Sequence, residues 1–139
     1  MRAVVGERFS TEVTLTPAKV AAFSEAAGDI NPIHFDPQFA ATTRFGRVIA
    51  SGTHTSALLL GLTATHFSKR GAVVGLEFTV TFRRAVFADE HVRIEWDVVK
   101  VTPNAALKGE IVDMVGRLLG QDGAPSVEAT GRVLVTAEL

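Results

Sequence analysis

Apolar residues recur at every second position in the C-terminal half of the chain. The clearest case is the segment 91–99, in which Val92, Ile94, Trp96 and Val98 share one face and charged residues occupy the other. A period of two is typical of a strand that is buried on one side. The same pattern predicts four strands after Ala72, in the ranges 75–87, 91–99, 106–119 and 127–137, with turns at 88–90 and 121–125 and a bulge near Gly109 or Gly116.

The first 28 residues read as a strand followed by a helix. Residues 4–15 alternate loosely and predict the strand. Thr16 and Pro17 then form a cap-and-proline start signal, and Gly28 is a helix stop. We therefore expect the first helix between these two signals.

Two further helices are predicted before the strands begin. Asp36 and Pro37 repeat the start signal and open a short helix that ends near Thr43. The segment 53–67 is apolar on most of its circumference, as is typical of a helix in the middle of a protein. An antiparallel sheet, its last four strands forming a meander around this helix, would bury the apolar face of every element. The order of elements thus predicts an α+β hot-dog fold in a single domain, residues 1–139.

Composition narrows the possible functions. A formal net charge of −1 and an isoelectric point near 6.4 provide no basic surface for a phosphate backbone, so we expect no nucleic-acid partner. The absence of cysteine excludes a disulfide framework, a thiolate metal site and a cysteine nucleophile. Hydrophobic residues make up 47% of the chain, which indicates a subunit interface in a homodimer or a larger oligomer.

Neither an export signal nor a membrane span is apparent. The N-terminus turns polar after two valines. The longest strongly apolar run, Ala57–Leu62, is far shorter than the roughly 20 residues that cross a bilayer. We therefore expect a soluble, cytoplasmic protein with no membrane partner.

The loop 28–39, "GDINPIHFDPQF", carries the polar groups best placed for chemistry. Pro32 stiffens it, so Asp29 and His34 are expected to face one small volume, as an acid/base pair must. A purely structural alternative is open: Asp29 closes a turn, His34 is a half-exposed loop residue, and Asp36 caps the next helix.

Residues 26–59, "AAGDINPIHFDPQFAATTRFGRVIASGTHTSALL", resemble the signature of the MaoC-like hydratases, the (R)-specific enoyl-CoA hydratase group. That signature contains G-D-x-N-P-x-H-x-D, a phenylalanine-alanine helix, F-G-x-x-I-A and a glycine that starts the central helix. The resemblance implies reversible syn hydration of a trans-2-enoyl-CoA to an (R)-3-hydroxyacyl-CoA, with no metal or organic cofactor. It also implies a site that lies across a dimer.

The resemblance implies a role for each matching residue. Asp29 would activate the water that adds to the β-carbon, and His34 would handle the proton at the α-carbon. The backbone N–H of Gly52, at a helix N-terminus, would receive the thioester oxygen. Asn31 would brace the pair. Together with Ser51 and Thr53, it is assigned to substrate binding.

Several positions depart from the family pattern. Ser51 stands where many members have histidine, Thr53 and His54 stand where apolar residues are common, and Leu60 replaces a serine of some hydratases. These departures concern the oxyanion side of the site and the choice of acyl group. They leave the Asp29 and His34 positions unchanged.

The other polar residues give weaker signals. His54 and His66 are twelve positions apart on one helix, too far to share a metal, and are expected on the helix surface or at an interface. His91 is expected to be solvated, and His34 with Asp36 would supply only two metal ligands. Candidate partners for coenzyme A phosphates are Arg44, Arg47, Lys69, Arg70, Arg83 and Arg84.

Two other functions remain as alternatives to the hydratase. Hot-dog thioesterases commonly place a carboxylate on or beside the central helix, and "GTHTSALLLGL", 52–62, contains none. A non-catalytic acyl-thioester-binding domain is the third possibility, because Ser51 and Leu60 depart from the pattern.

Overall fold

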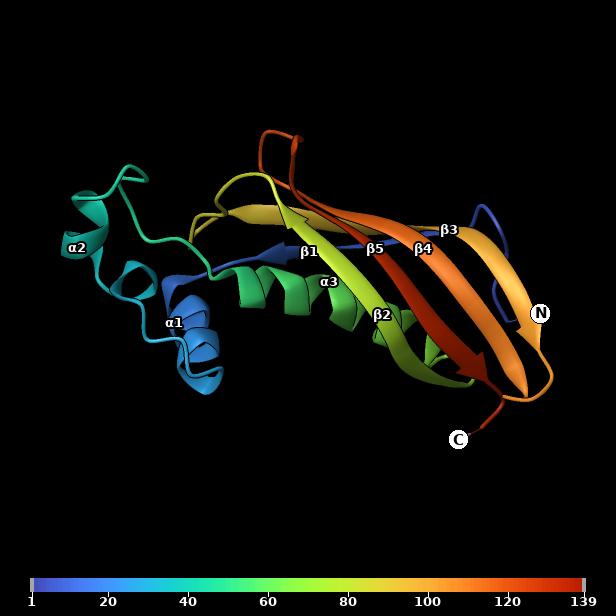
Figure 1. Ribbon diagram of the computed structural model, residues 1–139. Helices are drawn as coiled ribbons and strands as arrows, with labels where there is room; N and C mark the ends of the chain where they lie inside the picture. Colours follow the sequence, from blue (N-terminus) through green and yellow to red (C-terminus); the bar gives the residue numbers. More distant parts are fainter. Residues whose placement is uncertain (1, 139) are drawn as a thin grey trace.

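The computed structural model describes residues 2–138 and consists of one five-stranded antiparallel sheet with helices on one side (Figure 1). The elements in chain order are β1 (Arg8–Thr14), α1 (Pro17–Ala26), the 3₁₀ turn η1 (Pro32–His34), α2 (Pro37–Ala41), α3 (Gly52–Phe67), β2 (Ala72–Phe82), β3 (His91–Asn104), β4 (Gly109–Leu119) and β5 (Pro125–Thr136). The sheet curves over α3, whereas α1 and α2 lie beyond one end of it. This arrangement is the hot-dog fold expected from the order of elements.

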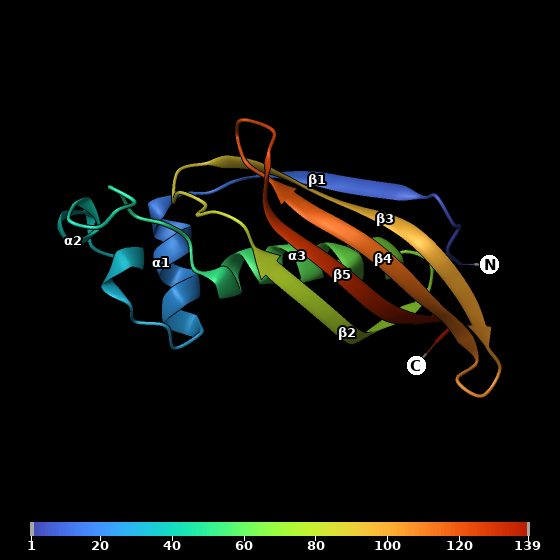
Figure 2. The same ribbon diagram turned by 45° about the horizontal axis from the view of Figure 1, so that its top comes forward.

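The strand neighbours differ from the expected meander. The order across the sheet is β1-β3-β4-β5-β2, so β3, β4 and β5 are consecutive neighbours but β2 lies at the far edge beside β5 (Figure 2). The turn at residues 88–89 is present, yet it leads to a strand on the other side of the sheet and does not close a hairpin. The meander was wrong because a period of two shows which side chains share a face, not which strands pair.

The face of α3 that packs on the sheet has a four-residue spacing. Thr55, Leu59, Thr63 and Phe67 are all buried, and the fully buried Trp96 of β3 donates its Nε1–H to the Leu59 carbonyl at 2.9 Å. The other side of this helix is only partly covered, by contrast with the expectation of a helix enclosed on most of its circumference. The chain by itself therefore leaves apolar helix surface open.

The expected bulge is not at Gly109 or Gly116, which both pair in register, and the sheet has register shifts at three other places. Strand β4 begins at Gly109 rather than near residue 106, and the register between β3 and β4 shifts at Val99, between Val98 and Lys100. Gly116 pairs with Trp96, and a Cβ at this glycine would lie 2.4 Å from two indole ring atoms. Gly116 is thus required by the close approach of the indole ring, not by a bulge.

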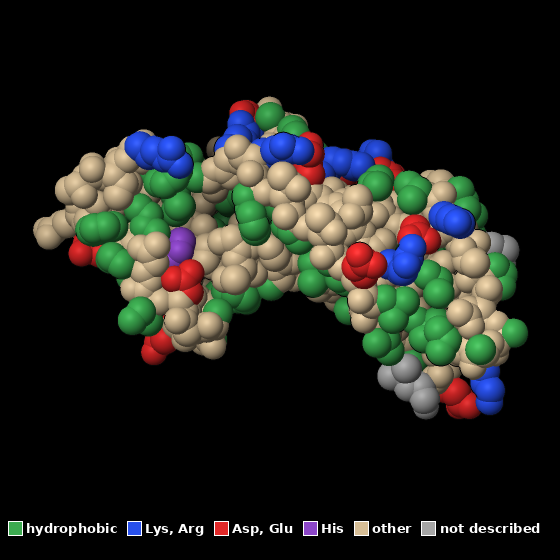
Figure 3. Space-filling model, in the orientation of Figure 1, with side chains coloured by type: hydrophobic (Ala, Val, Ile, Leu, Met, Phe, Trp, Pro, Cys, Tyr) green, Lys and Arg blue, Asp and Glu red, His purple; other side chains and the backbone are tan. Residues whose placement is uncertain are grey.

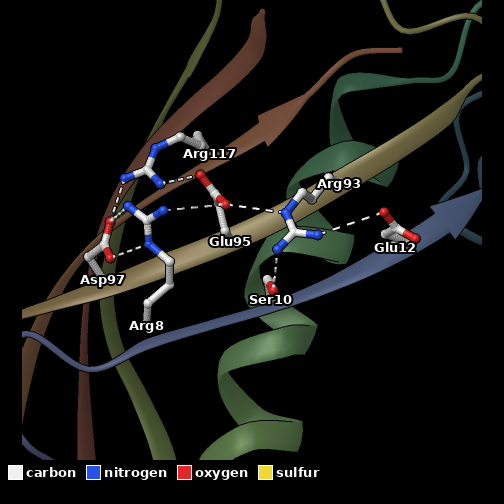
Figure 4. A network of polar contacts seen from close by, with 7 residues as sticks. All are labelled: Arg8, Ser10, Glu12, Arg93, Glu95, Asp97 and Arg117. Carbon is white, nitrogen blue, oxygen red and sulfur yellow. Dashed lines mark hydrogen bonds and ion pairs between the residues drawn. The ribbon is translucent and has the colours of Figure 1, made fainter. Parts of the chain in front are cut away.

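Charged residues cover the outer face of the sheet and tie its edge strand β1 to β3 and β4 (Figure 4). Arg8 pairs with Asp97 at 2.7 Å, and Arg117 reaches both Asp97 and Glu95 at 2.7 Å. The hydrogen bond from Arg8 is the main cause that lowers the pKa of Asp97 to about 2, and Arg117 chiefly lowers that of Glu95. This network keeps the outer face polar while the opposite face packs on α3.

A second ionic cluster joins the C-terminal end of α3 to the N-terminal segment. The Glu7 carboxylate lies 2.5 Å from His66 Nε2 and 2.6 Å from Arg70, and the His66 ring stacks on Phe9. Burial raises the pKa of Glu7, but hydrogen bonds from Arg70 and His66 outweigh it and bring the pKa to about 2. His66 was expected on the helix surface or at an interface. The structure corrects this expectation, because the His66 side chain contacts Glu7 and Phe9 of the same chain.

Glu7→Gln should lower the free energy of unfolding by about 2–3 kcal/mol at neutral pH, since a depressed carboxyl pKa stabilises the folded state. This contribution is complete above the unfolded pKa of 4.5 and is lost as pH falls toward the folded value of about 2. Urea unfolding at several pH values should therefore show the variant and the wild type converging below pH 5. The exposed Glu25→Gln is the control and should follow the wild type; parallel curves for Glu7→Gln would contradict the assignment.

Candidate functional site

The loop after α1 is positioned by short-range hydrogen bonds. Helix α1 ends at Ala26, and Gly28 turns the chain with φ +77°, a left-handed value that glycine adopts without strain. The Asp29 N–H then donates to the Ser24 carbonyl at 2.8 Å. Pro32 begins η1 directly afterwards. The sequence signal for the helix stop is confirmed, and Pro32 lies in a short 3₁₀ turn.

Asp29 and His34 lie together at this loop, with Oδ2 and Nε2 3.3 Å apart. The imidazole is buried, whereas the carboxylate is about one-third exposed at 35%. His34 Nδ1 is 2.7 Å from the Ile49 carbonyl oxygen, which can only accept, so Nδ1 donates and Nε2 faces the carboxylate. A carboxylate open to solvent beside an oriented imidazole can exchange a proton with it.

The two oxygens of Asp29 have different partners. Oδ1 accepts the Asn31 N–H at 3.1 Å, whereas Oδ2 faces His34. Asp29 therefore closes a turn through Oδ1 and faces the imidazole through Oδ2. The structural role and the chemical role expected for Asp29 thus belong to different oxygens of one side chain. Asn31 braces the carboxylate through its backbone, while its side chain caps η1 by accepting the Ile33 N–H at 3.2 Å.

The first turn of α3 presents Gly52 and Thr53 to solvent. Ser51 is buried at 1% exposure, and its hydroxyl accepts the His54 N–H at 3.1 Å and lies 3.0 Å from the Thr53 hydroxyl. Ser51 is thus the N-cap of α3. The N–H groups of a first turn have no acceptor inside the helix, so the Gly52 N–H can donate to an incoming oxygen.

A hollow of about 300 Å³ opens at Gly52. Its walls include Ile49, whose carbonyl orients His34, and the Phe82 ring, which lies 3.0 Å from where a Gly52 Cβ would be. The space-filling view shows that the molecule as a whole has a concave outline between its helical end and the far end of the sheet (Figure 3). Ile49 and Phe82 were not predicted at the site, because no local pattern marks a carbonyl or a ring that approaches from a distant segment.

The remaining histidines fall in different environments. His54 is buried and stacks on the Phe23 ring at 4.5 Å, and burial lowers its pKa. It was expected on the helix surface or at an interface, and the surface position is wrong, because α1 packs over that side of α3. His91 is exposed as expected.

Among residues 2–138, no cluster of three or more metal-ligating side chains occurs, and no helix has the length and hydropathy needed to cross a membrane.

Comparison with known proteins identifies the family. Residues 2–117 match the family model described as the MaoC like domain. The (R)-specific enoyl-CoA hydratase of Aeromonas caviae is 32% identical over 131 residues, which cover 94% of this chain and 92% of that enzyme. A solved (R)-hydratase structure from A. caviae superposes with a TM-score of 0.87 at 30% identity, covering 96% of this chain and 97% of the other. The structure of the R-hydratase PhaJ1 of Pseudomonas aeruginosa superposes with a TM-score of 0.86 at 28% identity, covering 96% of this chain and 83% of the other. The chain belongs to the MaoC-like domain family.

Proposed function

We propose that this protein is a hydro-lyase that adds water reversibly and in syn fashion to a trans-2-enoyl-CoA, giving an (R)-3-hydroxyacyl-CoA. The observation that carries the proposal is the 3.3 Å approach of Asp29 Oδ2 to an imidazole nitrogen whose ring is oriented by a carbonyl. The similarity over nearly the whole chain to an (R)-specific enoyl-CoA hydratase supports the same reaction.

The proposed reaction assigns one step to each group. Asp29 removes a proton from water, and the resulting hydroxide oxygen bonds to the β-carbon while the C–C double-bond electrons move toward the thioester. The Gly52 N–H donates to the enolate oxygen, where negative charge develops. His34 enters the cycle with a proton on each ring nitrogen and delivers the one on Nε2 to the α-carbon. The proton on Asp29 then passes to Nε2, which restores the starting state of both groups. The net change is the addition of one water.

Hydration of crotonyl-CoA and longer trans-2-enoyl-CoA thioesters by the purified protein tests the proposal. The expected result is loss of enone absorbance without release of free thiol. Thiol release from saturated acyl-CoA would support the thioesterase alternative. Binding of the whole panel without turnover would support the non-catalytic alternative.

We further propose that the active form is a homodimer paired through β2. Both edges of the sheet are open, but β1 carries charged residues such as Arg8 and Glu12, which discourage pairing. Strand β2 instead exposes Val74, Leu76 and Phe82, at 39%, 46% and 54%. Pairing two copies at this edge would cover these side chains and place a second chain beside Phe82 and the hollow at Gly52.

Leu76→Lys should shift the protein from dimer to monomer, because the dimer would bury one added charge from each chain. Sedimentation velocity over a concentration series measures the shift. Leu107→Lys is the matched control, since Leu107 is exposed to the same degree, 47% against 46%, but lies in the turn after β3. A wild-type monomer, or equal effects of the two substitutions, would contradict pairing through β2.

A further inference from the structure

Two hollows meet beside the N-terminus of α3 and share Arg84 and Ala85 in their walls. The hollow away from Gly52, of about 380 Å³, contains Arg47 and Arg84 together with Asp89, Glu90 and Asp122. The three carboxylates outnumber the two arginines, and both arginines are paired: Arg84 pairs with Asp122, and Arg47 lies 3.5 Å from Asp89. This hollow therefore has no unpaired positive charge for an anionic ligand.

The hollow that contains Gly52 has a different charge pattern. Three arginines line it, Arg44, Arg83 and Arg84, and among the described residues that line it none is Asp or Glu. The rest of the lining is mostly apolar and includes Phe45, Ile49, Phe82, Val86 and Val127. In a chain whose formal net charge is −1, this is a local excess of positive charge beside an apolar wall.

The three arginines are not equally available. Arg84 is held by Asp122 and by the Ala124 carbonyl, and Arg83 lies 3.0 Å from Glu128. Within residues 2–138, Arg44 has no carboxylate within ion-pair distance; its guanidinium lies 4.9 Å from the centre of the Phe45 ring. Arg44 is thus free to bind an anion, and exposed Arg83 can exchange its carboxylate for a stronger partner.

We propose that Arg44, assisted by Arg83, binds a phosphate of the carrier that brings the acyl thioester to Gly52. The inference rests on the proposed function and concerns the chemical group that carries the acyl chain into the same site. An apolar wall suits the uncharged part of a phosphopantetheine arm, and guanidinium groups form charge-assisted, bidentate hydrogen bonds with phosphate. Coenzyme A and a protein-bound phosphopantetheine have this phosphate in common, whereas pantetheine lacks it.

Calorimetric binding of three saturated thioesters tests the inference without any turnover: butyryl-CoA, butyryl-phosphopantetheine and butyryl-pantetheine. We expect the wild type to bind butyryl-CoA about tenfold more tightly than butyryl-pantetheine, as the loss of a charge-assisted contact implies. Arg44→Gln should remove this preference and leave butyryl-pantetheine binding unchanged. Arg83→Gln should reduce the preference for butyryl-CoA in part.

Arg132→Gln is the matched control. Arg132 is 48% exposed and pairs with Asp113, much as Arg83 is 57% exposed and pairs with Glu128, but it lies outside the hollow. An effect of Arg44→Gln on both phosphorylated thioesters would assign the contact to the phosphate of the arm. An effect on butyryl-CoA alone would assign it to the nucleotide.

Equal binding of butyryl-CoA and butyryl-pantetheine by the wild type would overturn the inference, as would a preference that survives Arg44→Gln. Failure of the proposed function is distinguishable, because it would appear as absence of hydration in the enoyl-CoA assay whatever the binding preference.

Discussion

Asp29→Asn is expected to lower kcat for enoyl-CoA hydration by about 10³-fold or more, as is typical for loss of a general base. The substitution removes the group that takes the proton from water. It retains an oxygen that can accept the Asn31 N–H, so the turn should keep its shape. Steady-state kinetics with circular dichroism and a thermal melt would separate lost chemistry from lost structure.

Asp36→Asn is the matched control, since it makes the same change seven positions away in the same loop. The Asp36 carboxylate caps α2 by accepting the Gln38 and Phe39 N–H groups at 2.9 and 3.3 Å. This substitution should cost about 1 kcal/mol of stability or less and leave kcat near the wild-type value. Asp29→Asn with more than a tenth of the wild-type kcat would contradict the assigned role.

Gly116→Ala is expected to destabilise the fold by about 3 kcal/mol, combining overpacking of a filled core with disturbance of a buried hydrogen bond. The new methyl would lie 2.4 Å from the Trp96 ring, which is fully buried. The ring cannot move away without loss of its hydrogen bond to the Leu59 carbonyl, which joins the sheet to α3. Urea unfolding should therefore show a clearly lower midpoint.

Gly61→Ala is the control for this effect. Gly61 lies inside α3, where an added Cβ would meet nothing within 4 Å, so alanine should stabilise the helix by about 0.5–1 kcal/mol. Equal effects at the two glycines would mean that the contact of Gly116 with Trp96 is not the cause.

Local signals in the sequence predicted the helical part well. Thr16, Asp36 and Gly28 mark helix ends, because a cap or a left-handed turn depends on only a few neighbouring residues. The buried face of β3 was equally readable from its alternation. The proximity of Asp29 and His34 was also expected, since a short stiff loop joins them.

Features that depend on distant segments could not be predicted in this way. Strand β2 pairs with β5, which lies far along the chain, and alternation within a strand carries no information about its neighbour. His54 is buried because α1 packs against it, so its helical position alone placed it wrongly on the surface. The Ile49 carbonyl that orients His34 comes fifteen residues later and has no side-chain signature.

The central claim is that one carboxylate and one imidazole, held side by side, add both parts of water to the same face of the double bond. Hydration of crotonyl-CoA in D₂O, followed by NMR of the product, measures this directly. The account predicts deuterium at the α-carbon syn to the new hydroxyl group, in a single (R)-3-hydroxy product. Anti addition, or a mixture of the two relative configurations, would contradict it.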